Sequence, residues 1–249
     1  MSLIYGINPV EGAINSNKTI NKIYFQKSNN EIFDIVKKAR QKKIVTVEAD
    51  KRKLDQMITG ENEKIKNSQG IVASVTEYNY YDVEDIINYA REKNEEPFVI
   101  ILDKIEDPHN LGAIIRTAEC MGVHGIIIQK RNACQITDTV EKVAAGACSY
   151  VKVARVTNIT ETIKYLKEQG LWIYGLDMEG ASNIYDEKLS GAIGIVVGNE
   201  GDGISRLVKE NCDIMLKIPM TGKINSLNAS VSSAISIYEV VRQKNKSIN

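Results

Sequence analysis

The chain has 249 residues, 43% of them hydrophobic and 26% charged, and a formal net charge of zero. This balance is typical of a folded globular protein and excludes a disordered or collagen-like chain. No apolar run approaches the roughly 20 residues that a membrane-spanning helix needs. The N-terminus, residues 1–10, lacks the basic start and the apolar stretch of a secretory signal. We therefore expect a cytoplasmic protein.

The cysteines and histidines argue against a metal centre. The four cysteines are far apart, with no C-x-x-C pair, and there are only two histidines. Such spacing favours neither a disulfide framework nor a zinc site. Because histidine is the commonest general acid or base near neutral pH, catalysis here would depend on other groups.

Residues 1–76 are basic, with 13 Lys and Arg against 8 Asp and Glu, a net charge of +5. Hydrophobic periodicity predicts alternating strands and helices there, with strands at 22–26, 44–48 and 70–75 and helices at 30–41 and 50–58. This alternation predicts a small α/β domain. Basic clusters also occur on solvated helix faces, so the charge supports a polyanionic partner only beside other observations.

The next segment, 77–96, is acidic, with 2 Lys and Arg against 7 Asp and Glu. It contains a predicted short helix at 83–91 and is followed by Pro97, which favours a break in regular structure. We therefore predict an acidic linker over 77–96 and a second domain over 97–249.

From Phe98 onward, β-branched apolar runs alternate with helical patterns. The predicted strands are 98–103, 125–129, 150–154, 171–176, 192–197 and 213–218, and the predicted helices are 111–121, 138–147, 158–169, 204–211 and 228–244. Such alternation is typical of a parallel sheet with helices on both faces. Ligands of these sheets bind beyond the carboxyl ends of the strands, so the loops there are the first candidates for a site.

The loop after the strand at 98–103 contains Asn110 and leads into a helix that carries Arg116. Asn110 is placed to cap the helix, and Arg116 follows one to two turns later. Alone, the two residues fit an ordinary cap and a surface arginine. An arginine beside a helix N-terminus is also suited to hold a phosphate or a carboxylate.

Two further strand ends carry unusual loops. After 192–197 comes Gly198-Asn-Glu200-Gly201-Asp-Gly203, in which three glycines allow a ligand to approach the backbone closely. The order is not G-x-G-x-x-G, which excludes a dinucleotide-binding fingerprint. After 213–218 comes a turn of small polar residues that includes Ser226 and Asn228, both also common as helix caps. Three such loops at strand ends favour one site over three separate turns.

In this order and spacing, the three loops resemble the motifs of the SpoU (TrmH-like) family of RNA ribose 2′-O-methyltransferases, in the SPOUT superfamily. The matching stretches are N-x-G-A-I-I-R-T-A from Asn110, G-N-E-G-D-G-I-S from Gly198, and I-P-M-x-G-x-x-x-S-L-N-A-S from Ile218. The resemblance covers the whole chain, since residues 4–10 are similar to the family's N-terminal signature and 69–73 to the last strand of its substrate-binding domain. Ser68 stands where relatives often have His, a departure that concerns RNA contact rather than the reaction.

The resemblance implies a fold, a cofactor and partners. The implied fold is α/β, a C-terminal parallel-sheet domain with a trefoil knot preceded by a small ribosomal-protein-like RNA-binding domain. The implied cofactor is S-adenosyl-L-methionine, the implied assembly is a homodimer, and no metal, membrane or DNA partner is expected. An RNA-binding role would account for the positive charge of residues 1–76 and would make binding sensitive to salt.

The motifs also imply site residues. The implied active-site residues are Asn110, Arg116, Glu200, Ser226 and Asn228, and the backbone near Gly198, Ile218 and Leu227 is implied to hold the cofactor. We expect Arg116 to fix a phosphate and stabilise the developing alkoxide rather than act as a general base, because a guanidinium stays protonated in proteins. We expect Glu200 to order the glycine loop or Asn110, and Ser226 and Asn228 to bind the ribose or fix the loops.

Within the family, the resemblance is to the enzymes that methylate a guanosine ribose in the peptidyl-transferase P loop of bacterial 23S rRNA, so 23S rRNA is the expected substrate. A tRNA ribose 2′-O-methyltransferase of the same family is one alternative, and the additional N-terminal domain favours rRNA over it. A non-catalytic RNA-binding ribosome-assembly protein is another, and it is disfavoured because all three motif loops are intact.

Overall fold

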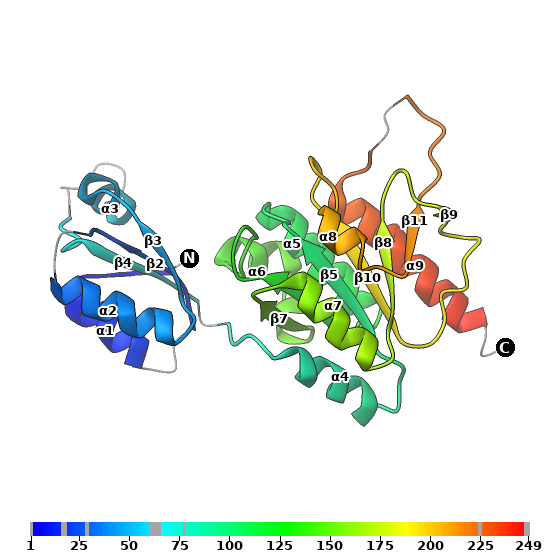
Figure 1. The fold of residues 1–249 in the computed structure, drawn as a ribbon, viewed down its shortest axis with the longest axis horizontal. Helices are drawn as coiled ribbons and strands as arrows, with labels where there is room; N and C mark the ends of the chain where they lie inside the picture. Colours follow the sequence, from blue (N-terminus) through cyan, green and yellow to red (C-terminus); the bar gives the residue numbers. More distant parts are fainter. Residues whose placement is uncertain are drawn as a thin grey trace. The chain divides into compact units, whose positions relative to one another are not determined.

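The computed structural model describes residues 2–15, 19–27, 30–59, 66–76, 78–223 and 226–246. The chain divides into two compact units, Met1–Asn79 and Tyr80–Asn249, each with its own sheet (Figure 1). No helix in the described part of the chain is long and apolar enough to span a bilayer.

The first unit is a four-stranded sheet in the order β1-β4-β2-β3, in which only the β2–β3 pair is parallel. Its elements are β1 (Ser2–Tyr5), α1 (Ile7–Asn15), β2 (Thr19–Phe25), α2 (Asn30–Gln41), β3 (Val45–Glu48), α3 (Lys51–Ile58) and β4 (Ile71–Thr76). Apolar residues of α1 and α2 form one core with β2 and β4, and α3 packs in a second, smaller cluster with Val72.

Strand β1 and helix α1 were not predicted from the sequence. Pro9 lies in the first turn of α1, where its missing N–H costs no intrahelical hydrogen bond. The signal that could have revealed the helix is the apolar spacing of Val10, Ala13 and Ile14, which are all buried.

The segment 77–96 carries a helix that belongs to the second unit, and the division between the units falls before it, after Asn79. This helix, α4 (Val83–Glu92), begins with a capping box formed by Asp82 and Asp85. Its acidic residues explain the polar composition from which a linker was predicted. Ile86 and Ile87 are nevertheless fully buried in the core of the second unit.

The second unit contains a seven-stranded sheet in the order β7-β6-β5-β10-β8-β11-β9, and every pair is parallel, which confirms the predicted sheet type. The strands are β5 (Phe98–Asp103), β6 (Gly125–Gln129), β7 (Lys152–Val156), β8 (Trp172–Leu176), β9 (Ser182–Asn183), β10 (Ile193–Gly198) and β11 (Ile214–Lys217). Six of them match predicted strands; the two-residue β9 was not predicted, because so short a run has no periodicity to detect.

Helices lie on both faces of this sheet (Figure 1). They are α5 (Pro108–Cys120), α6 (Asp138–Ala144), α7 (Ile159–Glu168), α8 (Arg206–Lys209) and α9 (Ala229–Lys246), with a short 3-10 helix at Ala147–Ser149. Residues of α4 and α7 share one core with the strands and with Val208 of α8. On the other side α5 contacts both α6 and α9.

Strand β10 is central, between β5 and β8. In its register with β5, Gly198 lies beside Asp103, so both strands end at the same level. Because the strands are parallel, the loops that follow β5, β8, β10 and β11 leave from one edge of the sheet. This edge holds the candidate site.

Candidate active site

Three side chains, one from each predicted motif, meet at this edge. Asn110 Nδ2 donates to Glu200 Oε1 at 2.7 Å, and Asn228 Nδ2 donates to the same oxygen at 2.6 Å. Asn228 Nδ2 also lies 2.9 Å from Asn110 Oδ1, which closes the triangle. Glu200 therefore orients both amides, and each predicted motif contributes one member of the group.

The role expected for Asn110 as a helix cap is wrong. Helix α5 begins at Pro108, and Asp107 is the cap, since its side chain accepts a hydrogen bond from the backbone N–H of His109 at 2.9 Å. Proline is favoured at the first helical position, which moves the helix start upstream. Asn110 lies within the first turn and is buried, so its amide is free for Glu200 and Asn228.

Asn228 has two roles at once. Its Oδ1 accepts hydrogen bonds from the backbone N–H and the hydroxyl of Ser230, at 2.9 and 2.6 Å, just before the first turn of α9. Its Nδ2 makes the two contacts of the triangle. Asn228 therefore caps the helix and belongs to the site, and the capping hydrogen bonds fix the direction in which its amide nitrogen points.

The glycine loop, defined as residues 198–205, folds tightly on itself. Asn199 Oδ1 accepts from the backbone N–H groups of Gly201 and Asp202 at 2.9 and 2.7 Å, and Asn199 pairs with Gly203. A Cβ on Gly198 would lie 2.1 Å from the carbonyl carbon of Gly203. A side chain is therefore excluded at Gly198 by backbone packing.

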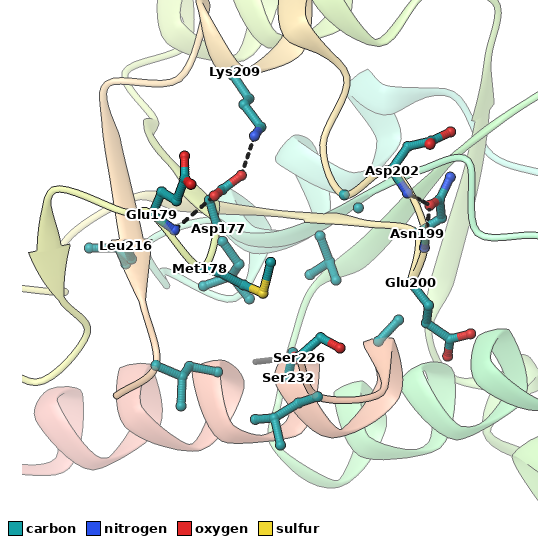
Figure 2. A pocket seen from close by; sticks show the side chains of 18 of the residues that line it. Asp177, Met178, Glu179, Asn199, Glu200, Asp202, Lys209, Leu216, Ser226 and Ser232 are labelled. Atoms are coloured by element: carbon teal, nitrogen blue, oxygen red, sulfur yellow. Dashed lines mark hydrogen bonds and ion pairs between the residues drawn. The ribbon is translucent and has the colours of Figure 1, made fainter. Parts of the chain in front are cut away.

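A pocket of about 270 Å³ lies beside the glycine loop (Figure 2). It is lined by the three predicted cofactor positions, Gly198, Ile218 and Leu227, and by the predicted Glu200 and Ser226. Five further lining residues are large and apolar, namely Leu176, Met178, Val197, Leu216 and Met220. Five predicted residues of the second and third motifs thus share one cavity, and Asn228 does not line it.

One wall of this pocket, the loop after β8, was not predicted from the sequence. It contributes Asp177, Met178 and Glu179. Lys209 of α8 also lines the pocket and forms an ion pair with Asp177 (Figure 2). Burial acts to raise the pKa of Asp177, but the hydrogen bond and charge of Lys209, with the backbone N–H of Glu179 at 2.9 Å, hold it below its ordinary value. The sequence signal that could have indicated this wall is the acidic loop directly after the predicted strand at 171–176.

Arg116 is not part of the triangle. It lies six residues after Asn110 on α5, which places the two side chains about 120° apart around the helix axis. Arg116 is exposed and does not line the pocket. Among the described residues of this chain, no hydrogen bond or ion pair holds it.

Two other predicted features can be placed. The described residues contain no cluster of His, Cys, Asp and Glu suited to a metal ion. Ser68 is fully buried in the first unit, where its backbone N–H and hydroxyl donate to Asp55 Oδ1 at 2.8 and 2.5 Å. These hydrogen bonds hold the pKa of Asp55 below its ordinary value.

Comparison with known proteins agrees with this geometry. The family model described as "SpoU rRNA Methylase family" matches residues 97–238, and one described as "RNA 2'-O ribose methyltransferase substrate binding" matches residues 3–81. YacO of Bacillus subtilis, assigned to the TrmH family of tRNA/rRNA methyltransferases, is 40% identical over 97% of this chain and 96% of its own. A Staphylococcus haemolyticus protein assigned to the same family is 42% identical over 98% of this chain and 96% of its own.

Solved structures show the same fold. The SpoU methyltransferase AviRb from Streptomyces viridochromogenes, in complex with AdoMet, has a TM-score of 0.61 at 23% identity, covering 98% of this chain and 90% of its own. The TrmH/SpoU tRNA modifying enzyme of A. aeolicus has a TM-score of 0.55 at 28% identity, covering 66% of this chain and 85% of its own. With both of its units matched by family models and with relatives at 40% identity over nearly its full length, the chain belongs to the SpoU family of RNA methyltransferases.

Proposed function

We propose that this enzyme transfers the methyl group of S-adenosyl-L-methionine to a ribose 2′-hydroxyl of 23S rRNA. The observation that carries the proposal is the junction of the three motif loops, where Asn110, Glu200 and Asn228 meet beside a pocket. The match of residues 3–81 to a substrate-binding model for ribose 2′-O-methyltransferases supports the ribose 2′-oxygen as the methyl acceptor.

The pocket suits S-adenosyl-L-methionine. Apolar side chains of Leu176, Val197 and Leu216 offer a surface for an adenine ring. The lining contains Asp177, Glu179, Glu200 and Asp202 against Lys209, and this acidic excess favours a ligand that carries positive charge. When bound, this cofactor supplies a methyl group activated by a positively charged sulfur.

The residues of the chain act mainly by positioning. Transfer to an oxygen needs the 2′-hydroxyl held in line, and positioning alone can supply a large part of the rate. We assign the amides of Asn110 and Asn228, fixed by Glu200, and the exposed hydroxyl of Ser226 to the ribose. Arg116 holds the neighbouring phosphate and stabilises the oxyanion as the proton leaves to phosphate or water.

Arg116 reaches this site, in our proposal, from a second copy of the chain. Within one copy it is exposed and lies outside the triangle and the pocket, and a phosphate clamp needs it near the ribose. An exposed apolar stripe of Val231, Ile235 and Tyr238 runs along α9, with exposed fractions of 44%, 37% and 56%. Because α9 packs against α5, which carries Arg116, a homodimer that covers this stripe would bring the arginine of one copy toward the other.

Mixed dimers test this arrangement. Copies with Arg116→Ala and copies with Asn228→Ala are each expected to be inactive alone. If Arg116 acts across the interface, random mixing restores about a quarter of wild-type activity, since half the dimers are mixed and each has one intact site. If Arg116 acts within its own copy, the mixture stays inactive, and the proposed role of the second copy is refuted.

The substrate is tested by transfer of labelled methyl from S-adenosyl-L-methionine to unmodified 23S rRNA and, separately, to unmodified tRNA. Label on a guanosine 2′-oxygen in the P loop of 23S rRNA, absent with Arg116→Ala, is the expected result. Label in tRNA alone would refute the substrate and keep the reaction. No transfer to either RNA, despite binding of RNA and cofactor, would favour a non-catalytic assembly role or a requirement for a ribosomal precursor particle.

The trefoil knot belongs to the same proposal. Segments that line the pocket come from chain positions as distant as Leu176 and Ser232, and the backbone of Leu216 lies against Gly180, where a Cβ would come within 2.4 Å. This close crossing of backbones supports a threaded C-terminus. The knot predicts a slow refolding rate for the denatured chain. We expect faster refolding for a variant that is cut before α9 and supplied with that helix as a peptide.

A further inference from the structure

The short helix α8, which follows the glycine loop, is fastened at both ends to the sheet. At its start, the backbone N–H and the hydroxyl of Ser205 both donate to Asp103 Oδ2, at 2.7 and 2.6 Å. At its end, Lys209 forms an ion pair with Asp177. We call these two contacts the loop clamp.

The contact of Asp103 with Ser205 is buried and specific. Asp103 is the last residue of β5 and has no exposed surface, although its side chain is a carboxyl group. Ser205 occupies the N-cap position of α8, yet its side chain makes no cap hydrogen bond to its own helix. The hydroxyl donates instead to one oxygen, Oδ2, of a carboxylate 102 positions earlier in the chain.

The contact of Asp177 with Lys209 lies at the pocket itself (Figure 2). Asp177 follows the last residue of β8, and both side chains line the cavity. Their exposed fractions are 15% for Asp177 and 39% for Lys209, so the pair is partly screened by solvent.

The two carboxylates lie on either side of the strand from which the glycine loop departs. Strand β10 lies between β5 and β8, and Asp103 is beside Gly198 in the register of β5 with β10. The loop therefore leaves the sheet between two anchored points, and the helix that ends it is fixed to both. Glu200 of the triangle is carried by this same loop.

We propose that the loop clamp positions the glycine loop as a wall of the cofactor pocket, so that Asp103, Ser205, Asp177 and Lys209 are positioning residues for S-adenosyl-L-methionine. The inference rests on the proposed function, which supplies the ligand. A loop that is ordered before binding does not lose conformational entropy when the ligand arrives. Breaking the contact of Asp103 with Ser205 therefore weakens binding although neither side chain lines the pocket.

The chain contains a matched control for each half of the clamp. Ser68 donates its backbone N–H and hydroxyl to one oxygen of Asp55, as Ser205 does to Asp103, but it lies in the first unit. Lys167 pairs with Asp213 at 2.6 Å with exposed fractions of 37% and 14%, nearly those of Lys209 and Asp177. Neither Ser68 nor Lys167 lines the pocket.

The experiment measures the dissociation constant of S-adenosyl-L-methionine for the full chain by calorimetry. We expect about a tenfold increase for Ser205→Ala, which loses a hydrogen bond to a buried carboxylate. For Lys209→Met, at a half-exposed pair, we expect about a threefold increase. The conservative variants Ser205→Thr and Lys209→Arg should bind nearly as the wild type does, and the controls Ser68→Ala and Lys167→Met should leave the constant unchanged.

Each outcome decides the proposal. Constants within twofold of wild type for both Ser205→Ala and Lys209→Met would overturn it, and so would equal losses in the two controls. If Ser205→Ala fails to fold, Lys209→Met still gives the answer. Loss of a positive charge from the pocket would by itself favour a cationic ligand, so weaker binding than in Lys167→Met reports the loss of the clamp. Failure of the wild type itself to bind the cofactor would refute the proposed function, and the clamp with it.

Discussion

The packing of Gly198 against Gly203 gives a prediction whose size can be worked from the structure. In Gly198→Ala the new methyl group would lie 2.1 Å from the Gly203 carbonyl carbon and 2.2 Å from its oxygen. Ordinary contacts begin near 3.4 Å, so the loop backbone would have to move by about 1.3 Å. Overpacking costs up to about 3 kcal/mol where side chains can adjust, and here backbone must move, so we expect about 3 kcal/mol or more.

The chain provides both a control and a probe for this prediction. A Cβ on Gly201, in the same loop, would meet only Asn199 Oδ1, at 3.6 Å, so Gly201→Ala should unfold within about 2 °C of wild type. Trp172 is the only tryptophan and lies on β8 next to β10, so its fluorescence reports on the second unit.

For a unit of this size, about 3 kcal/mol corresponds to a fall of about 6–12 °C in the unfolding midpoint. Thermal melts of wild type, Gly198→Ala and Gly201→Ala followed at Trp172 should therefore separate clearly. Equal midpoints for wild type and Gly198→Ala would refute the close packing of the glycine loop on β10. Equal losses in the two variants would show that the loop tolerates no side chain anywhere, for a reason other than this contact.

Three further predictions follow from other parts of the chain. Gly112→Ala should lower the free energy of unfolding by about 1–3 kcal/mol in urea titrations, because its Cβ would lie 2.7 Å from Val143 Cβ between α5 and α6; a variant as stable as wild type would contradict that packing. Asp177 has a lowered pKa in the folded state, so it stabilises the fold above the unfolded value of about 3.9 and loses that effect as the pH falls through the folded value. The stability difference between wild type and Asp177→Asn should thus be present at pH 7 and shrink below about pH 4, and a difference independent of pH would disprove it. A thiol reagent at pH 8 should modify one cysteine quickly, the exposed Cys120, and rapid reaction of a second would contradict the burial that raises the pKa of the others, to about 11 for Cys134 and Cys148 and about 12 for Cys212.

Much of the second unit could be predicted from the sequence. Its strands are continuous apolar runs because both faces of a parallel sheet are covered, and that pattern survives without any tertiary information. The predictions failed where a local signal has two meanings. Acidic residues of α4 made a packed helix resemble a linker, although Ile86 and Ile87 already marked its buried side.

The candidate site shows the same division. The sequence motifs indicate Asn110, Glu200 and Asn228 individually, because their residue types and neighbours are local features. Their meeting depends on strand order, which places β5 beside β10 although 89 residues separate the end of one from the start of the other. No periodicity encodes that neighbourhood.

The sequence by itself thus determined the alternation of elements, the parallel sheet and the three loops that carry the motifs, since each depends on residues close together in the chain. The tertiary structure decided which groups interact across long separations: Asp103 with Ser205, Lys209 with Asp177, and Arg116 apart from the triangle. The physical reason is that hydrogen bonds and ion pairs act over a few ångströms, and only the folded sheet brings such distant residues within that range.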